Sequence, residues 1–506
     1  MAALPEILAR HARSQPDALA LITPEEVITY RQLWERVSGL ADRLRHSGLS
    51  RFGLCGDNGL AWVLADLACG MANVVCVPIP GFFSPRQTEH LIDHAGLDAL
   101  LRPRSDLPEA RYQLESAVAL QRLPTTPGAV AVPPGTGKVT FTSGSTGKPK
   151  GVCLAHDQLD ATVSALAERL QGVPIRRHLC LLPLATLLEN VAGIYLPLTL
   201  GASILLWPQA ELGMTGSSGL DASRLITVLN HTRPDSLILV PELAAALVQA
   251  AEEGWLKTGH FRFLAVGGAR VSPALLSRAQ ALGLPLYEGY GLSECGSVVA
   301  LNRPGAGRAG TVGRPLSHVT VTVDDQGEIS VSGNTFLGYL GDPTQPAARL
   351  ATGDLGSLDD DGYLRVSGRR KNLLITSFGR NISPEWLESE LMQRVGARQA
   401  MAFGDGEAQP SALLVLTDSR PLEQVQAALR QVNTSLPDYA RLRRVYLRRE
   451  PLTRADGHVT ANGRPVRHRI LENLPALQAA SQPLTLSTTA PESCTPAPVK
   501  EQTLSE

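Results

Sequence analysis

The spacing of apolar residues divides the chain into segments with different periodicities. Apolar residues recur at helical spacing over residues 4–14 and again over 31–46. From there to about residue 285, helical stretches alternate with short apolar runs, which read RFGLCG, VVCVPIP, HLCLLPL, ASILLWP, SLILVP and FRFLAVGG. This alternation predicts an α/β fold with largely parallel sheets.

The pattern changes twice in the second half of the chain. Residues 310–367 carry short runs rich in valine, threonine and glycine, with turn sequences DDQG and DDDG, and predict a small antiparallel β unit. After GRRKN at 368–372, NISPEWLESELMQRV predicts a helix begun by proline, and SALLVLTD predicts a buried strand. We expect an N-terminal domain of stacked α/β sheets plus the β unit (1–368), a small α+β C-terminal domain (369–475), and a disordered polar tail (476–506).

Composition excludes several classes of protein. The 506 residues carry 47 Lys and Arg against 48 Asp and Glu, so no overall field favours nucleic acid or an anionic membrane. Seven cysteines are scattered without a C-x-x-C pair, so we expect reduced thiols and neither a disulfide framework nor a zinc site. No signal peptide and no run of about twenty apolar residues is found, which predicts a cytoplasmic protein without integral membrane association.

The segment TSGSTGKPKG, from Thr142 to Gly151, carries the clearest chemical signal. Its glycines let backbone N–H groups approach a ligand, while its hydroxyls and two lysines can bind the oxygens of a polyphosphate. A Walker A loop is excluded, because Thr142 and Pro149 occupy positions that need glycine and Ser/Thr. A flexible turn is the alternative; the combination of hydroxyls and lysines favours a phosphate site built from Thr142, Ser143, Gly144, Ser145, Thr146, Gly147, Lys148 and Lys150.

This loop is similar to the signature loop of the adenylate-forming (AMP-binding) superfamily, which includes acyl-CoA synthetases, luciferases and peptide-synthetase adenylation domains. Four more segments resemble that family in the same order: LPLATLLEN at 182–190, AVGGAR at 265–270, YEGYGLSE at 287–294 and TGDLGSLDDDGYLRVSGRRKN at 352–372. The resemblance is closest to acyl-CoA synthetases. It implies an AMP-forming acid–thiol ligase that binds ATP and Mg²⁺, activates a carboxylic acid as its acyl adenylate, and transfers the acyl group to a thiol.

The resemblance also implies roles for individual residues. Tyr290 would stack on adenine, Asp354 with Arg369 would hold the ribose, and Thr142 and Glu294 would hold magnesium. Glu294, Lys150 and Arg464 would be the catalytic residues. Lys371 would be the hinge on which a mobile C-terminal domain rotates between two half-reactions. Further ATP contacts are implied for Gly268, Ala269, Glu288, Gly289, Gly291 and Ser293, and the acyl pocket for Thr186, Glu189 and Gly268. Without the resemblance, the ordinary interpretation is that Tyr290 is a core residue, that Glu294 is a surface residue and that the run RRK is a solvent-exposed basic segment.

Two positions depart from the family pattern. Thr186 stands where many members carry histidine, and Arg464 stands where a lysine contacts the carboxylate and the α-phosphate. Arginine spreads its charge over a larger planar group, so the exchange is not conservative. Three interpretations stay open: Arg464 takes the lysine's role, Arg467 takes it after a register shift, or adenylation is impaired.

The substrate and the acceptor follow from the same resemblance. LPLATLLEN lacks the aspartate with which amino-acid-activating members grip an ammonium group, so we expect a fatty or other simple aliphatic acid. The acceptor is either coenzyme A or the phosphopantetheine of a carrier protein. The alternative function is that of a catalytically weak homologue, which binds nucleotide or acyl ligands as a regulatory or partner protein.

Overall fold

The computed structural model describes residues 3–83, 85–103, 105, 117–124, 130–142, 150–215, 219–268, 271, 273–342, 344, 346–369, 374–382, 384–416, 420–453, 456–458 and 467–486. Its contacts divide the chain into two compact units, Met1–Trp386 with Gly404–Ala408, and Leu387–Phe403 with Gln409–Glu506. Both units mix helices and sheets, as the sequence predicts. Residues 369–386 belong to the first unit in this division, and the domain boundary near residue 369 stays a prediction.

The first layer of the larger unit is a mostly parallel sheet. Among the described residues its strands lie in the order β17, β16, β15, β14, β13, β9, β10, β1, β2. The strands from β15 to β1 in this order pair in parallel, and antiparallel strands flank them. The strands are β1 (Leu19–Ile22), β2 (Val27–Thr29), β9 (Arg177–Leu179), β10 (Ser203–Leu205), β13 (Ser236–Leu239), β14 (Phe263–Val266), β15 (Leu286–Tyr290), β16 (Ala300–Leu301) and β17 (Arg314–Pro315).

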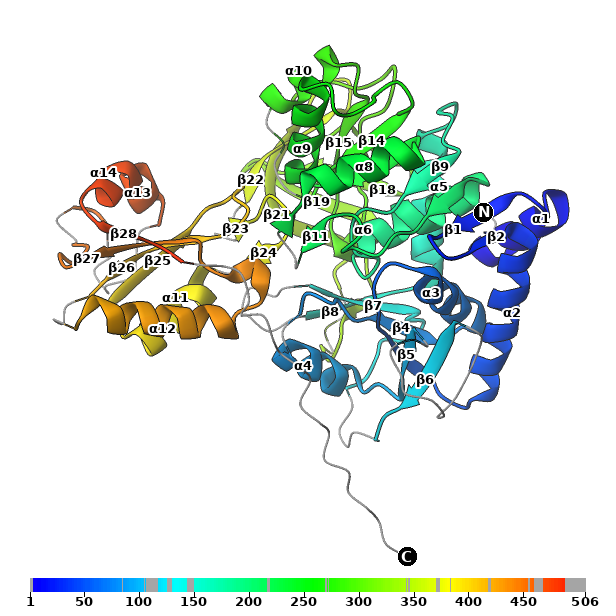
Figure 1. The fold of residues 1–506 in the computed structure, drawn as a ribbon, viewed down its shortest axis with the longest axis horizontal. Helices are drawn as coiled ribbons and strands as arrows, with labels where there is room; N and C mark the ends of the chain where they lie inside the picture. Colours follow the sequence, from blue (N-terminus) through cyan, green and yellow to red (C-terminus); the bar gives the residue numbers. More distant parts are fainter. Residues whose placement is uncertain are drawn as a thin grey trace, which may run out of the picture. The chain divides into compact units, whose positions relative to one another are not determined.

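Helices cover this sheet because its parallel strands are apolar on both faces. All four residues of β13 are buried, and α9 (Pro241–Glu252) packs against that strand while α10 (Pro273–Ala281) packs against β15. With α8 (Ala222–Thr232), these helices lie beside the green part of the sheet in Figure 1. A two-stranded ribbon, β11 (Met214–Thr215) with β12 (Gly219–Leu220), precedes α8.

The second layer is a sheet with the described strands in the order β20, β8, β7, β4, β3, β5, β6. Helix α3 (Leu60–Ala72) packs on its strands and α2 (Tyr30–His46) packs on α3, next to α1 (Leu4–Ser14); α4 (Pro85–Ala95) links β4 to β5. Thr29 caps α2 through a capping box with Gln32, so the helix predicted over 31–46 begins at a well-defined residue. The strands are β3 (Arg51–Leu54), β4 (Val75–Pro78), β5 (Ala99–Pro103), β6 (Val118–Arg122), β7 (Lys138–Thr142), β8 (Lys150–Leu154) and β20 (Gly338–Tyr339).

The predicted phosphate loop joins β7 to β8. These strands are antiparallel, and Thr142 pairs directly with Lys150, so the two residues that flank the loop face each other. Residues 143–149 lie outside the described residues. Helix α5 (His156–Arg169) follows β8, as the spacing of Leu159, Val163 and Leu166 predicts.

A continuous helical run follows β9 and contains an irregularity that the sequence pattern does not reveal. It consists of α6 (Leu187–Glu189), the π-helix η2 (Asn190–Tyr195) and α7 (Leu196–Leu200). The N–H of Leu196 bonds to the carbonyl of Val191, five residues earlier, where an α-helix would bond four residues back.

The β unit predicted over 310–367 is the antiparallel sheet β18, β19, β21, β22. Its last pair places Asp354 directly opposite Arg369. A short hairpin of β23 (Leu374–Ile375) and β24 (Asn381–Ile382) follows. The strands of the unit are β18 (Val319–Val323), β19 (Glu328–Gly333), β21 (Arg349–Leu358) and β22 (Leu364–Arg369).

The smaller unit is built on the sheet β25 (Gln399–Phe403), β26 (Ser411–Val415), β27 (Arg444–Arg448) and β28 (Gln482–Thr485). Figure 1 shows α11 (Pro384–Val395) and α12 (Leu422–Ser435) on one side of it and α13 (Arg467–Glu472) and α14 (Leu474–Ala479) on the other. The helix begun by proline and the buried strand SALLV are as predicted. Within the described part of the chain, no helix is both long and apolar enough to cross a bilayer.

Substitution of Leu40 tests which face of α2 packs against the rest of the unit. The side chain of Leu40 is fully buried, so Leu40→Ala is expected to lower the free energy of unfolding by about 2–5 kcal/mol. Arg43→Ala, on the exposed face of the same helix, should change it by no more than about 0.5 kcal/mol. Urea denaturation followed by tryptophan fluorescence measures both, and equal losses would contradict the assignment of the faces.

Candidate active site

A cavity of about 670 Å³ lies where the parallel strands β13, β14 and β15 end. Its lining includes Val240, Gly267, Gly268 and Tyr290, which stand at or just after the carboxyl ends of these strands. In α/β sheets the carboxyl ends of parallel strands are where ligands bind, and this volume is that of a typical small-molecule site. All of the lining residues belong to the larger unit.

One part of the lining is polar. Thr142 and Lys150 come from the ends of β7 and β8, and Ser293 and Glu294 from the short 3₁₀ turn η3 (Ser293–Cys295) after β15. Gly291, which also lines the cavity, lies against the backbone of Ser297. A Cβ on Gly291 would stand 1.7 Å from the Ser297 carbonyl oxygen. Only glycine allows this close approach, which lets the turn carrying Glu294 fold back beside β15.

Tyr290 and Asp354 meet although 64 residues separate them. The phenol of Tyr290 donates a hydrogen bond to Asp354 Oδ2 at 2.6 Å. Tyr290 lines the cavity; Asp354 is buried and outside the lining, which its neighbours Thr352 and Gly353 join. The pair joins the large sheet to the β unit and offers an aromatic face beside a carboxylate, the two groups that stacking on a base and binding of ribose hydroxyls require.

Tyr339 contacts Glu294 and Lys150 in the polar part of the cavity. The motifs of the sequence do not indicate this tyrosine. Its phenol donates to Glu294 Oε1 at 2.9 Å, and the ammonium of Lys150 lies 5.3 Å from its ring centroid. Burial, followed by the charge of Glu294, raises the pKa of Tyr339, so the phenol keeps its proton as a donor. The antiparallel pairing of Tyr339 with Val152 brings it there, and no local signal in the sequence reveals that pairing.

The same part of the cavity fits a hard cation. Glu294 supplies a carboxylate and Thr142 a hydroxyl to the lining, and oxygen donors of this kind are the ligands that Mg²⁺ takes in proteins. Lys150 adds positive charge for phosphate oxygens. These residues can therefore bind a magnesium–polyphosphate group together.

A second part of the lining is apolar. Its residues come from α5 and the chain after it, from residues 182–200 and from β13; they include Leu166, Leu170, Ile175, Leu182, Leu187, Leu188, Ala192, Leu196, Leu200, Leu237 and Ile238. Polar residues elsewhere in the lining include Ser236, Ser297, Glu328, Arg380 and Asn381. Thr186 lines the apolar part as well, and its hydroxyl has no hydrogen-bond partner among the described residues. This part suits a hydrocarbon group more than a charged one.

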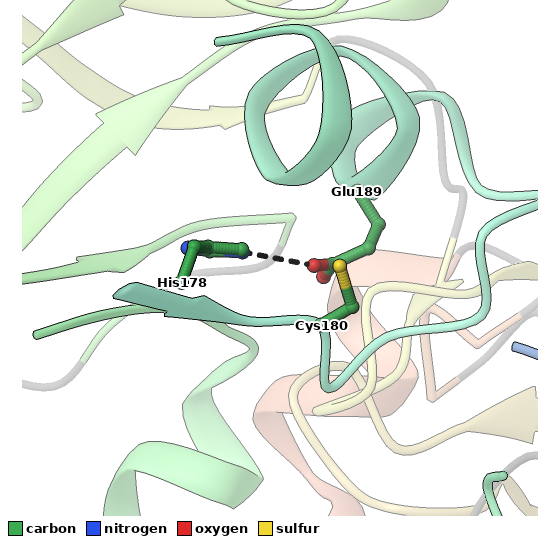
Figure 2. Close-up of side chains that lie close together, drawn as sticks. All are labelled: His178, Cys180 and Glu189. Atoms are coloured by element: carbon green, nitrogen blue, oxygen red, sulfur yellow. Dashed lines mark hydrogen bonds and ion pairs between the residues drawn. The ribbon is translucent and has the colours of Figure 1, made fainter. Parts of the chain in front are cut away.

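Glu189 lies behind the cavity wall and not in it. Figure 2 shows its carboxylate between the ring of His178 and the sulfur of Cys180. His178 Nε2 lies 3.3 Å from Glu189 Oε1, and the backbone N–H of Leu182 donates to Oε2 at 3.1 Å. His178, which does line the cavity, bonds to Ser236 through Nδ1 at 2.9 Å. Sequence reasoning missed His178 because it stands in an apolar run.

These three side chains offer nitrogen, sulfur and oxygen atoms within 4.8 Å of one another, the spacing of metal ligands. Each already has a protein partner, since the thiol of Cys180 also donates to the Gly193 carbonyl at 3.5 Å. Burial and the charge of Glu189 raise the pKa of Cys180 well above its usual range, which favours the neutral thiol over the thiolate that binds metal. We therefore interpret His178, Cys180 and Glu189 as a hydrogen-bonded cluster that supports the cavity wall.

The structure places the other predicted site residues as follows. Gly268, Gly289, Gly291 and Ser293 line the cavity, while Glu288 lies in β15 opposite Val266 and outside the lining. Arg369 lies on β22, opposite Asp354, and its side chain is outside the described part of the structure. The predictions for Ser143, Gly144, Ser145, Thr146, Gly147, Lys148, Ala269, Lys371 and Arg464 fall outside the described residues.

Comparisons with known proteins agree with this geometry. The AMP-binding enzyme family matches residues 8–340, and the AMP-binding enzyme C-terminal domain matches residues 371–476. A feruloyl-CoA synthase of Amycolatopsis is 30% identical over 431 residues, which cover 78% of this chain and 84% of that protein. A long-chain-fatty-acid–CoA ligase of Mycobacterium bovis is 24% identical over 402 residues, 63% of this chain and 65% of the ligase.

The fold is similar to that of a solved structure, a double mutant of the o-succinylbenzoate CoA synthetase from Bacillus subtilis bound to a product analogue. The TM-score is 0.74 at 22% identity, and the match covers 92% of this chain and 98% of that one. The predicted mixed α/β fold, with a large N-terminal and a smaller C-terminal part, is therefore confirmed.

Tyr339→Phe tests whether the phenol orients Glu294. Loss of the hydrogen bond should raise the Mg²⁺ concentration needed for half-maximal ATP turnover roughly tenfold, as when other residues that orient a metal ligand are changed. Tyr363→Phe, which removes a hydroxyl bonded to the Ala306 carbonyl outside the cavity lining, is the matched control. Equal Mg²⁺ titrations for the wild type and both variants would refute the role of Tyr339.

Proposed function

The chain belongs to the AMP-binding enzyme family as an acid–thiol ligase, and we propose that it activates an aliphatic carboxylic acid with ATP and Mg²⁺ and transfers the acyl group to coenzyme A. The observation that carries this proposal is a single cavity with two kinds of lining. Its polar part holds Thr142, Lys150 and Glu294, and its apolar part is lined mainly by leucines. A molecule that joins a phosphate-bearing nucleotide to a hydrocarbon chain, such as an acyl adenylate, suits both.

Adenylation joins the two parts of the cavity. A carboxylate oxygen of the acid attacks the α-phosphorus of ATP, the bond from that phosphorus to the bridging oxygen breaks, and pyrophosphate leaves. The residues present supply position and charge: Tyr290 offers its ring to the nucleoside, Asp354 is bonded to the Tyr290 hydroxyl, and Lys150 faces the phosphates. Magnesium, when bound by Glu294 and Thr142, would neutralise part of the charge on the leaving pyrophosphate.

Thioester formation then consumes the adenylate. The sulfur of a thiolate attacks the acyl carbon, and the bond from that carbon to the phosphate oxygen breaks, so that AMP leaves with both electrons. Coenzyme A is the proposed acceptor because relatives with similar sequences are named CoA synthases and CoA ligases. A carrier protein with a phosphopantetheine arm would supply the same thiol.

The apolar lining supports an aliphatic acid. No aspartate stands in LPLATLLEN, and no lysine or arginine besides Lys150 and Arg380 is among the described lining residues. The relatives are named for an aromatic acid and for fatty acids, so their similarity does not decide between the two classes. The proposal of an aliphatic acid therefore depends on the cavity lining. The leucines of α5 and of the helical run present aliphatic side chains to the acid, which suits a hydrocarbon chain.

Pyrophosphate release from ATP and Mg²⁺ tests this function. We expect release with straight-chain aliphatic acids, weaker release with cinnamic-type aromatic acids, and stimulation by coenzyme A. Asp354→Asn should weaken release with every acid to a similar extent, because it acts on the nucleotide and not on the acid.

Each outcome of this panel decides a separate point. Better turnover of aromatic acids would overturn the aliphatic assignment, and stimulation by a phosphopantetheinylated carrier alone would overturn coenzyme A as acceptor. No release with any acid, with ATP binding established by calorimetry, would refute the activation reaction and favour a nucleotide-binding regulatory protein.

Arg464 is our proposed adenylation residue, and the structure gives a reason to prefer it to Arg467. The guanidinium of Arg467 bonds to Glu388 and, at 2.6 Å, to the carbonyl of Ala402, all within the smaller unit. An arginine held in this way has a structural task of its own. The position of Arg464 in the sequence carries the proposal.

Arg464→Ala is therefore expected to lower acid-dependent ATP–pyrophosphate exchange roughly a hundredfold, the usual cost of removing one group that stabilises transition-state charge. Arg443→Ala removes an exposed arginine of the same unit and should leave the exchange unchanged. Unchanged exchange in Arg464→Ala would show that another group carries the role.

A further inference from the structure

A network of buried polar side chains joins the helical run to α3 and β7, outside the cavity lining. It consists of Asp66 on α3, Lys138 on β7, and Asn190 and Tyr195 at the two ends of η2; we call it the Lys138 network. Lys138 and Asp66 are each only 1% exposed. None of the four residues belongs to the cavity lining, so binding of substrate does not explain them.

Every strong donor and acceptor at the centre of this network has a partner. The ammonium of Lys138 donates to Asp66 Oδ1 at 2.6 Å, to the Tyr195 hydroxyl at 2.8 Å and to Asn190 Oδ1. The other carboxylate oxygen, Asp66 Oδ2, accepts from Asn190 Nδ2 at 2.8 Å and from Tyr195 at 2.7 Å. Three donors of the ammonium therefore meet three acceptors.

Such a network is costly to break. Burial disfavours the charged carboxylate of Asp66, but the charge of Lys138 and the hydrogen bonds from Lys138, Tyr195 and Asn190 outweigh it and lower its pKa. A buried ion pair gains little stability over a well-packed apolar pair, so its value lies in fixing one geometry. Removal of any one partner leaves another polar group buried and unsatisfied.

The geometry that this network fixes is the π-helix. In an α-helix, residues five positions apart point about 140° away from each other, because each residue turns by about 100°. In η2 the backbone bonds over five residues, and Asn190 and Tyr195 reach the same carboxylate oxygen. The π register is thus the one in which both side chains face Asp66.

The neighbouring residues of the run face two other directions. Glu189 and Gly193 face His178, where a Cβ on Gly193 would stand 2.3 Å from Glu189 Oε1. Leu188, Ala192 and Leu196 line the apolar part of the cavity. The run is therefore held from two sides by polar clusters while its third side forms the wall.

We propose that the Lys138 network positions the wall of the acyl pocket: it keeps residues 190–195 in the π register and thereby determines which acyl chains fit. Its residues are positioning residues, since none touches substrate. The proposal rests on the proposed function only in that the apolar part of the cavity holds the acyl group. Lys138 stands at the start of β7, and Thr142 ends the same strand.

Tyr195→Phe and Asn190→Ala test this proposal on the full-length protein. Each removes hydrogen bonds to Asp66 without adding volume. We expect the kcat/KM ratio between the best acid and one that is two carbons longer to change roughly tenfold, as when a hydrophobic pocket changes by a methylene. The KM for ATP should stay within about twofold, because the nucleotide part of the lining is untouched.

Tyr30→Phe is the matched control. Its side chain is also buried, and its hydroxyl donates to the Ala202 carbonyl at 2.8 Å, away from the Lys138 network. It should lower the melting temperature, because a buried hydrogen bond is lost, and leave the preference among acids unchanged. If all three variants shift the preference equally, or if none does, the network serves stability alone and the proposal is overturned.

Two further measurements keep the test decisive. Direct binding of the same acids is followed by calorimetry, so a wild type that releases no pyrophosphate refutes the proposed function while the order of binding still tests the wall. If Tyr195→Phe does not fold, the double variant Lys138→Met with Asp66→Asn, which removes both charges together, takes its place in the same series. An unchanged binding order in the folded variant contradicts the proposal.

Discussion

A lysine ammonium in the interior of the larger unit constrains the elements around it. Lys138 needs acceptors in three directions, and it finds them on α3 and on both ends of the π-helix. These elements come from distant parts of the sequence, so satisfying one charge fixes their separation and rotation together. Apolar contacts alone tolerate small sliding movements, whereas hydrogen bonds to a buried charge do not. The cavity next to this core inherits that rigidity.

The polar part of the cavity is organised in the same way, through pairs that join separate layers. Tyr290 at the end of the large sheet bonds to Asp354 in the β unit, and Tyr339 on the second sheet bonds to Glu294. Each pair couples a residue that faces the cavity to another that arrives from a different sheet. The site is preorganised because its side chains are held by partners outside the reacting groups.

The sequence predicts the elements of the fold well and the contacts between them poorly. The parallel strands, α2, α5 and the β unit follow from periodicity, and the cavity residues Thr142, Lys150, Tyr290 and Glu294 follow from motifs. The expectation that Glu189 faces the pocket stays a prediction, and the described geometry puts His178 in front of it. Tyr339, His178 and Lys138 carry no local signal, since each matters only through partners at long sequence distance. The π-helix is hidden because its apolar residues also fit an α-helical pattern.

The helical run places residues that border open space next to one, Gly193, that borders a buried carboxylate. Ala192 and Leu196 face open space, so exchanges there alter the volume offered to a ligand and leave the backbone in place. Any side chain at residue 193 would meet the carboxylate of Glu189 and the ring of His178, so one of these buried groups would have to move. Single exchanges at Ala192 or Leu196 can therefore change the space offered to a ligand while the buried cluster behind Gly193 keeps its contacts.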